Sequence, residues 1–301
     1  MHTIRLAAAF MRPRILKSGS LRSLMGPIEF TLAVLFTSAF AGLLGALTGL
    51  GGGVVIVPAL VLLFHIDLRY AIGASLISVI ATSSGAAVSY VREGLSNVRI
   101  GMFLEVATTL GALVGAYLTT RVTTHAIGII FGVTLLYSAW SSFRAKQDEL
   151  EATPNALAEK LNLKGDYPTV HGPQSYTAHR VPAGFGIMFI AGVLSGLLGI
   201  GSGAVKVLAM DRAMKLPFKV STTTRNFMIG VTAAASAGLY LGQGYIAPGL
   251  AAPVMLGVLA GSILGASLLV KIRVPILRAV FAVVIVALGI EMIYSGATGR
   301  L

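Results

Sequence analysis

Eight long apolar segments, each about the length needed to cross a lipid bilayer, dominate this sequence. A membrane-spanning helix needs about 20 mainly apolar residues, and runs of that length fill most of the chain. Because backbone N–H and C=O groups must be paired inside lipid, continuous runs of this kind predict helices. The expected spans are 29–50 (with its apolar run extending to 64), 70–91, 99–119, 124–143, 182–210, 217–241, 246–269 and 274–296.

The scarcity of charged residues supports the same conclusion. They make up 11% of the chain, against about 25% in soluble domains, which argues against a cytosolic enzyme, a disordered chain and a nucleic-acid-binding protein. The net charge is +12, but the basic residues gather in the first 25 positions and in short loops. Flanks of membrane spans have this charge pattern. We predict an all-α polytopic membrane protein that contacts the lipid bilayer and no nucleic acid.

Two segments are predicted to lie outside the membrane. Residues 1–28 form a basic N-terminal tail, interpreted as an amphipathic surface segment, with a cleaved signal peptide as the alternative. Residues 144–181 carry five basic and five acidic residues and are expected to form a polar loop, with a short helix near Pro154–Leu163. The membrane part then divides into 29–143 and 182–301.

These two membrane parts are predicted to be repeats of one another. A shift of 150 residues without a gap superposes the glycines of one part on those of the other, and a glycine pattern held in register for so long is not expected by chance. We therefore predict duplicated four-span repeats, about eight transmembrane helices in all, with a glycine-broken first helix in each repeat. The matched glycines include Gly49, Gly51 and Gly53 with Gly199, Gly201 and Gly203, and Gly111 and Gly115 with Gly261 and Gly265.

The first predicted span is too long for one straight crossing. As a helix, residues 29–64 would measure about 54 Å, whereas the hydrocarbon core is about 30 Å thick. The chain must break at the glycine-rich stretch, and Val54–Phe64 is either re-entrant or crosses again. Eight single crossings make the repeats parallel, and a second crossing makes them inverted. With eight spans, the N-terminal side collects 13 Lys and Arg residues and the other side 8, which favours a cytoplasmic N-terminus.

The two glycine breaks are candidate anion-binding sites. Glycine allows a helix to unwind within the membrane and exposes backbone N–H groups, and a half-helix that starts after the break points its positive end at the unwound segment. The alternative is a purely structural role, in which the glycines allow close helix packing through small residues. No strand precedes these glycines and no Lys-Ser or Lys-Thr pair follows them, so they are not a nucleotide-binding loop. The candidate substrate-binding residues here are Gly51, Gly52, Gly53, Gly201, Ser202 and Gly203.

A polar face follows each break. Ser75 and Ser78 share one arc of the second span, and Thr222 and Arg225, with Asn226 beside Arg225, occupy the corresponding part of the sixth. We predict that these residues line the same substrate site. Hydroxyl groups that bond to neighbouring helices or to their own carbonyl groups are the alternative.

Three of the charged residues inside predicted spans are candidates for a function. Lys206 follows the second break by three residues, and with Arg225 it suits an anion pocket, because intramembrane bases are costly and face a cavity or a partner. Snorkelling toward the interface is the alternative. Glu105, in the third span, is predicted to neutralise one of these bases or to carry a coupling proton.

The sequence offers no sign of an enzyme or of a bound cofactor. It contains no cysteine, so thiolate metal ligands and a cysteine nucleophile are excluded. The histidines lack ligand spacing with a carboxylate, so no metal site is expected. No Ser-His-Asp set and no pair of carboxylates falls within the spans. We expect neither catalytic residues nor a cofactor.

The glycine-rich region resembles a known transporter family. Ala41-Gly42-Leu43-Leu44-Gly45, Gly49-Leu50-Gly51-Gly52-Gly53 with the following Val54–Pro58, and Ala71–Ser75 are similar to the TauE/SafE sulfite exporter family, also called the toluene-sulfonate uptake permease group. The resemblance covers about 29–296. It implies secondary transport of small anions, often sulfite, thiosulfate or organosulfonates, across the bacterial inner membrane.

The function expected from these observations is secondary transport of a small anion by alternating access between the repeats. The bases, the hydroxyl groups and the N–H groups at the breaks would bind the anion. No ATP-binding motif is present, so an ion or substrate gradient would drive transport. The alternative is an anion channel or a membrane assembly subunit without a transport cycle of its own.

Overall fold

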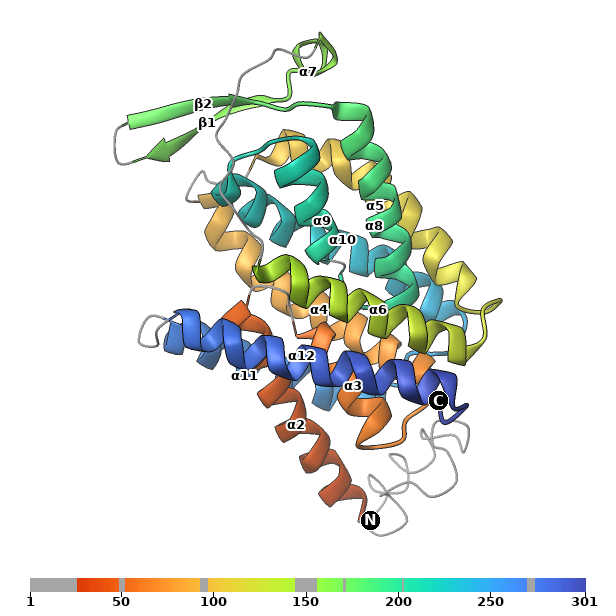
Figure 1. Ribbon diagram of the computed structural model, residues 1–301. Coiled ribbons are helices and arrows are strands. Elements are labelled where there is room, and N and C mark those ends of the chain that lie inside the picture. Colours follow the sequence, from red (N-terminus) through yellow and green to blue (C-terminus); the bar gives the residue numbers. More distant parts are fainter. Residues whose placement is uncertain are drawn as a thin grey trace.

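The computed structural model describes residues 26–48, 52–92, 97–143, 156–169, 172–201, 203–269 and 274–301. Helices form nearly all of it (Figure 1), in agreement with the predicted all-α membrane protein. The first half contains α2 (Pro27–Thr48), α3 (Gly53–Leu62), α4 (Leu68–Arg92), α5 (Val98–Leu118) and α6 (Thr124–Phe143). Next come α7 (Ala156–Lys160), β1 (Lys164–Thr169) and β2 (Gly172–Thr177). The second half contains α8 (Val181–Leu198), α9 (Gly203–Val207), the π-helix η2 (Leu208–Ala213), α10 (Phe218–Gly242), α11 (Pro248–Leu269) and α12 (Val274–Ala297).

Four of the described helices are by themselves long and apolar enough to cross a membrane. They contain the segments Pro27–Gly45, Val98–Leu118, Val181–Leu198 and Pro248–Gly265, which belong to α2, α5, α8 and α11. These helices expose large apolar side chains such as Phe36 and Ile263 on the outside of the molecule, where lipid chains would solvate them. α10, in contrast, carries Arg225 and a row of hydroxyl groups and needs neighbours that can pair with them.

Each main helix contact joins the two halves of the chain. α2 packs on α11, α5 on α8, α6 on α12 and α4 on α10. Glycines allow the closest of these approaches, because a Cβ added to Gly192 would overlap the carbonyl oxygen of Thr108, and one added to Gly111 would overlap that of Phe189. α5 and α8 run parallel: Gly111 lies against Phe189, and Gly115, one turn later in α5, lies against Val193, one turn later in α8. The small-residue packing expected of membrane helices is therefore present.

The chain turns back after each glycine break. The ring of Phe30, early in α2, lies edge-on to that of Phe64, just after α3, with 5.7 Å between their centroids. In the second half, the backbone N–H of His179, before α8, donates to the carbonyl oxygen of Met214, after η2, at 3.0 Å. α3 therefore leads back to the end at which α2 begins, and α9–η2 leads back to the end at which α8 begins. Eight single crossings do not describe this path.

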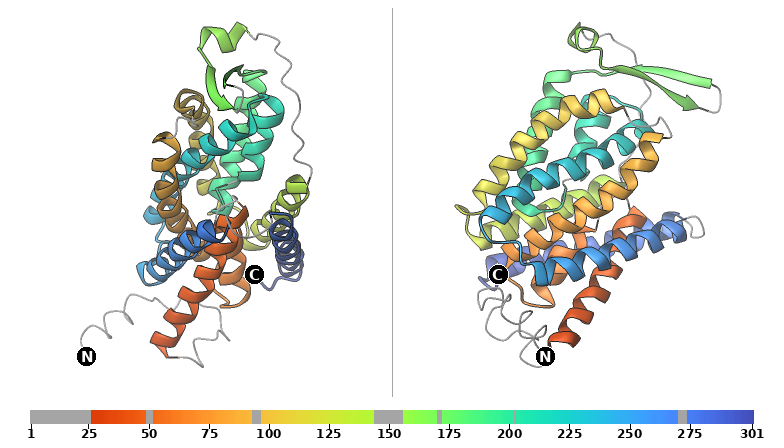
Figure 2. Two further views of the ribbon diagram at one scale, coloured as in Figure 1. Left: turned by 90° about the vertical axis from the view of Figure 1, so that its left-hand side faces the viewer. Right: turned by 180° about the vertical axis from the view of Figure 1, so that it is seen from behind.

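These two returns occur at opposite ends of the helix bundle. We call one end the terminal face, defined by Phe64, Arg69, Val122, Tyr245 and Leu301. Arg69 connects three loops of this face. Its guanidinium donates to Val122 O at 3.3 Å and lies 5.7 Å from the centre of the Tyr245 ring. Figure 2 shows the beginning of α2 and the C-terminus at this end.

The opposite end, the hairpin face, carries the extramembrane segment and is defined by Asn97, Asn162, Tyr176, His179 and Met214. The short helix predicted there is present as α7. The sequence analysis did not predict the β-hairpin, in which β1 pairs antiparallel with β2 from Lys164↔Thr177 to Thr169↔Gly172. The hairpin projects beyond the helices (Figure 2).

Asn97 attaches the hairpin to the helices. Its side-chain oxygen caps α5 by accepting from Ile100 N at 3.0 Å, and its Nδ2 donates to Tyr176 Oη at 2.8 Å and Lys164 O at 3.2 Å. Burial raises the pKa of the Tyr176 hydroxyl above its ordinary value, so this group is neutral near pH 7 and serves as an acceptor. Leu163, which is buried, packs in one apolar cluster with Tyr176.

Candidate functional site

The two glycine breaks meet inside the bundle at Ser75. Ser75 Oγ, on α4, donates to Gly199 O at 2.9 Å, and a Cβ added to Gly53 would lie 2.7 Å from Ser75 Oγ and 3.1 Å from Gly199 O. Gly199 and Gly201 have φ values of +68° and +69°, a conformation that glycine adopts without strain. The break thus requires glycine at both positions, and Ser75 connects the first half of the chain to the break in the second half.

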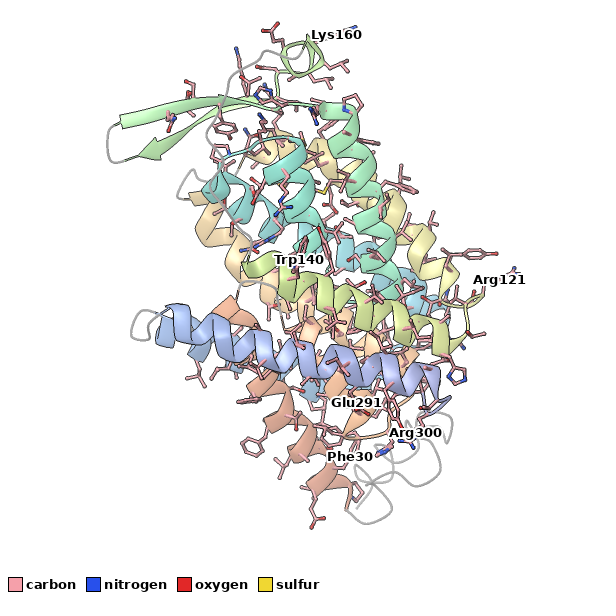
Figure 3. All side chains as sticks on the ribbon, viewed as in Figure 1. Phe30, Arg121, Trp140, Lys160, Glu291 and Arg300 are labelled. Carbon is pink, nitrogen blue, oxygen red and sulfur yellow. The ribbon has the colours of Figure 1, made fainter. Side chains whose placement is uncertain are left out.

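Lys206 lies three residues beyond this break and is completely buried. Its Nζ donates to Thr232 Oγ1 at 2.8 Å, the one acceptor that the ammonium has within the described part of the chain. An ammonium group carries three donors, so two of them remain for another partner. The position contrasts with basic residues such as Arg121 and Lys160, whose side chains point outward at the edge of the molecule in Figure 3.

Thr232 connects Lys206 to an acid. Thr232 Oγ1 donates to Glu105 Oε1 at 2.8 Å, and Thr109 Oγ1 donates to the same oxygen at 3.1 Å. Glu105 is 5% exposed, and its second oxygen, Oε2, has no hydrogen-bond partner among the described residues. The structure therefore brings Glu105 and Lys206 into one network through a shared hydroxyl, one of the two roles expected for this acid.

Arg225 occupies the hairpin-face side of the same helix. Its side chain is 5% exposed, and its Nη1 donates to Gly203 O, the first residue of α9, at 3.5 Å. The neighbouring Thr224 accepts from the backbone N–H of Asn97 at 3.0 Å, which links this part of α10 to the base of the hairpin. Both intramembrane bases thus approach the segment that follows the second glycine break, as the anion-pocket interpretation requires.

The other predicted residues contribute unequally. Ser78 Oγ donates to Ser75 O of its own helix, as in the alternative in which these hydroxyl groups bond to carbonyl groups of their own helix. A Cβ added to Gly52 would lie 2.6 Å from Val258 Cγ1, so Gly52 serves packing against α11. Thr222 and Asn226 are half-buried, and Thr222 Oγ1 lacks a partner among the described residues. Gly51 and Ser202 lie outside the described residues.

Sequence reasoning missed two hydroxyl groups at this site. Thr109 stands four residues after Glu105, a spacing that places the two side chains on one helix face, so this signal was available. Ser195, one turn before the second break, is completely buried, and its Oγ has no partner among the described residues. Its counterpart in the first repeat is Gly45, so the repeat pattern contained no hint of it.

A cavity of about 380 Å³ opens between α6, α8 and α9 and is lined almost entirely by apolar side chains, among them Val133, Leu194 and Val205. None of its lining residues is charged. By itself it does not suit an anion, although Val205 immediately precedes Lys206. The polar network and this apolar cavity are distinct features.

A family model named "Sulfite exporter TauE/SafE" matches residues 34–292. The chain belongs to this family. The match includes both glycine breaks, Glu105, Lys206 and Arg225, so the whole candidate site lies within the family's domain.

Relatives of this TauE/SafE protein are named as transporters. It is 27% identical over 264 residues to "Probable membrane transporter protein YunE" of Bacillus subtilis, covering 85% of this chain and 94% of the relative. It is 26% identical over 236 residues to "Probable membrane transporter protein YdhB" of the same organism, covering 78% and 89%. A "Probable membrane transporter protein" of Xylella fastidiosa is 34% identical over 116 residues, covering 36% and 44%. No solved structure gives a significant match. The family name and these relatives indicate a membrane transporter rather than an enzyme.

Proposed function

We propose that this chain is a secondary transporter of a small anion, either sulfite, another sulfur oxyanion or an organosulfonate, and that the anion binds where the second glycine break meets Lys206 and Arg225. The family supports membrane transport, and the buried bases support an anionic substrate. Ser75, Thr222, Ser195 and the N–H groups at the breaks would supply further hydrogen bonds.

The observation that carries the proposal is the incomplete pairing of Lys206. A buried charge is costly unless it is paired and hydrogen-bonded, yet this ammonium, at 0% exposure, has one neutral hydroxyl as its described acceptor. A bound oxyanion would accept from its remaining donors. A sulfonate or sulfite group offers several oxygens, which suits a point charge with divergent N–H groups.

Alternating access between two inverted, duplicated repeats is the mechanism that we infer. α2–α3 starts and ends at the terminal face, whereas α8–η2 starts and ends at the hairpin face. The 150-residue shift relates α2 to α8 and α5 to α11. The contact between α2 and α11 therefore corresponds to the contact between α8 and α5, and both are present. Broken helices that meet at the centre of inverted repeats are a common plan for secondary transporters.

On this path we propose the opposite orientation from the one that the sequence alone favoured. The charge count that favoured a cytoplasmic N-terminus assumed that the first span crosses once, which the return of α3 contradicts. Counted over the full sequence on this path, 8 Lys and Arg residues fall on the terminal side, including the five that precede α2, and 13 fall on the hairpin side. The positive-inside rule then supports a cytoplasmic hairpin face in the cell inner membrane, with the N-terminus on the other side.

The proposal is tested by anion binding and flux in one purified preparation. Sulfite, thiosulfate, sulfate, taurine and acetate are compared for their effect on the melting temperature, since a ligand present at 100 times its Kd stabilises the folded state by about 2.7 kcal/mol. We expect a saturable shift with one sulfur anion and saturable uptake into proteoliposomes, both lost in Arg225→Ala and retained in Arg121→Ala.

Three results would overturn the proposal. Unchanged affinity in a folded Arg225→Ala protein would remove this residue from the site. Anion flux without saturation would instead support a channel, and the absence of both binding and flux would support an assembly subunit.

A further inference from the structure

We propose that the Thr232 hydroxyl couples anion binding at Lys206 to protonation of Glu105, so that each anion crosses the membrane together with one proton. This inference rests on the proposed function and concerns the same site. It assigns a positioning role to Thr232, which lies on the polar face of the predicted sixth span.

The geometry around Thr232 Oγ1 carries the inference. The oxygen receives a hydrogen bond from Lys206 Nζ at 2.8 Å. It is also 2.8 Å from each of two acceptors, Glu105 Oε1 and the carbonyl oxygen of Met228. A hydroxyl group has one proton to donate, so it can serve only one of these acceptors fully at a time. The Thr232 hydroxyl is therefore a rotor: it can turn between two alternative hydrogen bonds, one to Glu105 Oε1 and one to Met228 O.

The two positions of the rotor correspond to two charge states of Glu105. While Glu105 is a carboxylate, it accepts the Thr232 proton, and the charges of Glu105 and Lys206 balance through the shared hydroxyl. When Glu105 carries a proton, it no longer needs this donor, and Thr232 turns to Met228 O one turn earlier in its own helix. That second bond is available without any backbone movement.

Anion binding drives the change from the first state to the second. An oxyanion that accepts from the two remaining donors of Lys206 supplies the negative charge that Glu105 supplied before. Asp211 interacts electrostatically with Arg225 and balances its charge, so Lys206, Glu105 and the anion together would hold one net negative charge in a medium of low dielectric, where like charges repel strongly. Glu105 relieves this by taking a proton from water onto Oε2, the oxygen without a hydrogen-bond partner among the described residues. Lys206 stays an ammonium, and a monoanion and a proton are carried together with no net charge.

Few other charged groups surround this pair. α5 packs on α8 and α10, and α8 contains no ionisable residue. α10 contains Arg225 and, in its first turn, Lys219. η2 contains Arg212 and the half-buried Asp211, whose carboxylate accepts from Ser221 near the hairpin face. Arg225 and Asp211 lie on the hairpin-face side and are not bonded to Thr232 in the described structure. Glu105 is thus the acid placed to respond to the charge on Lys206.

The test measures the ratio of protons to anions in proteoliposomes that contain a fluorescent pH indicator. Methanesulfonate serves as the probe, because it is a monoanion that takes up no proton near neutral pH. Thr232→Val removes the hydroxyl at constant side-chain shape, and Thr232→Ser restores it. Thr134→Val is the matched control, because Thr134 is also buried and donates to a carbonyl of its own helix, but it lies on α6. Glu105→Gln removes the proton acceptor.

We expect wild type, Thr232→Ser and Thr134→Val to move protons with the anion in a constant ratio. Thr232→Val and Glu105→Gln should move the anion with at least a tenfold smaller proton signal and should respond to membrane voltage. A Thr232→Val protein that keeps the wild-type ratio would overturn the inference. Wild-type anion flux without protons would overturn it too, while leaving the proposed function intact. A wild-type protein with no anion flux would refute the proposed function itself.

Discussion

Phe30 and Phe64 stand 34 positions apart in the sequence, yet their rings meet edge-on with 5.7 Å between centroids. This contact places the beginning of α2 and the end of α3 at one face of the molecule. Because α4 starts from that face as well, α2 and α3 together make no net crossing of the bundle.

The first prediction concerns this topology. Glu29, at the beginning of α2, and His65, just after α3, are both exposed, and the chain has no cysteine of its own. If α3 returns, these two positions lie on one side of the membrane. We therefore expect Glu29→Cys and His65→Cys both to react with a membrane-impermeant maleimide in intact spheroplasts, and Lys164→Cys to react only after permeabilisation. Labelling of Glu29→Cys and His65→Cys from opposite sides would contradict the return of α3.

The second prediction tests helix packing with two glycines of the same helix. A Cβ added to Gly192 would overlap the backbone of α5, whereas one added to Gly186 would meet nothing within 4 Å. Gly192→Ala should therefore lower stability by about 1–3 kcal/mol through overpacking. Gly186→Ala should leave it unchanged or raise it by up to about 1 kcal/mol, because alanine favours helix. Melting temperatures in detergent check both, and equal shifts would argue against close α5–α8 contact.

The third prediction separates the two roles of Asn97. Asn97→Asp keeps an acceptor for the Ile100 N–H but loses the donor to Tyr176 and Lys164, so the hairpin should become sensitive to protease while the helices keep their stability. Asn97→Ala also loses the cap, which is worth about 1 kcal/mol, and should lower the melting temperature as well. Limited proteolysis with mass spectrometry locates the cleavage, and a hairpin that resists cleavage in both variants would show that Asn97 does not anchor it.

The fourth prediction uses a double-mutant cycle on the central network. Lys206→Met leaves the buried Glu105 carboxylate without its balancing charge, which should cost about 3–5 kcal/mol and abolish anion binding. Adding Glu105→Gln should restore most of the stability but not the binding. The melting temperatures of the four proteins give the coupling. Strictly additive effects would mean that the Thr232 bridge does not connect the two charges energetically.

The sequence alone predicted the parts of the fold that depend on local composition. Apolar runs of span length determine membrane helices whatever their neighbours, since unpaired backbone groups cannot remain in lipid. Both breaks were located from their glycines, and Lys206, Arg225 and Glu105 stood out because charges are rare inside such runs. The hairpin was not predicted, because its strands contain Gly and Pro and lack the alternation of apolar and polar residues that marks a half-buried strand.

The direction of the chain after each break, and the partners of the buried charges, were decided by the tertiary structure. A glycine permits a turn but does not choose between crossing and returning, and contacts such as Phe30 with Phe64 make that choice. Similarly, the sequence suggested that Glu105 neutralises Lys206 or Arg225, but the spacing of these residues along separate helices does not indicate which base it meets or that Thr232 joins them. Side chains far apart in the sequence are brought together only by helix packing, and here close glycine contacts between the two halves set that packing.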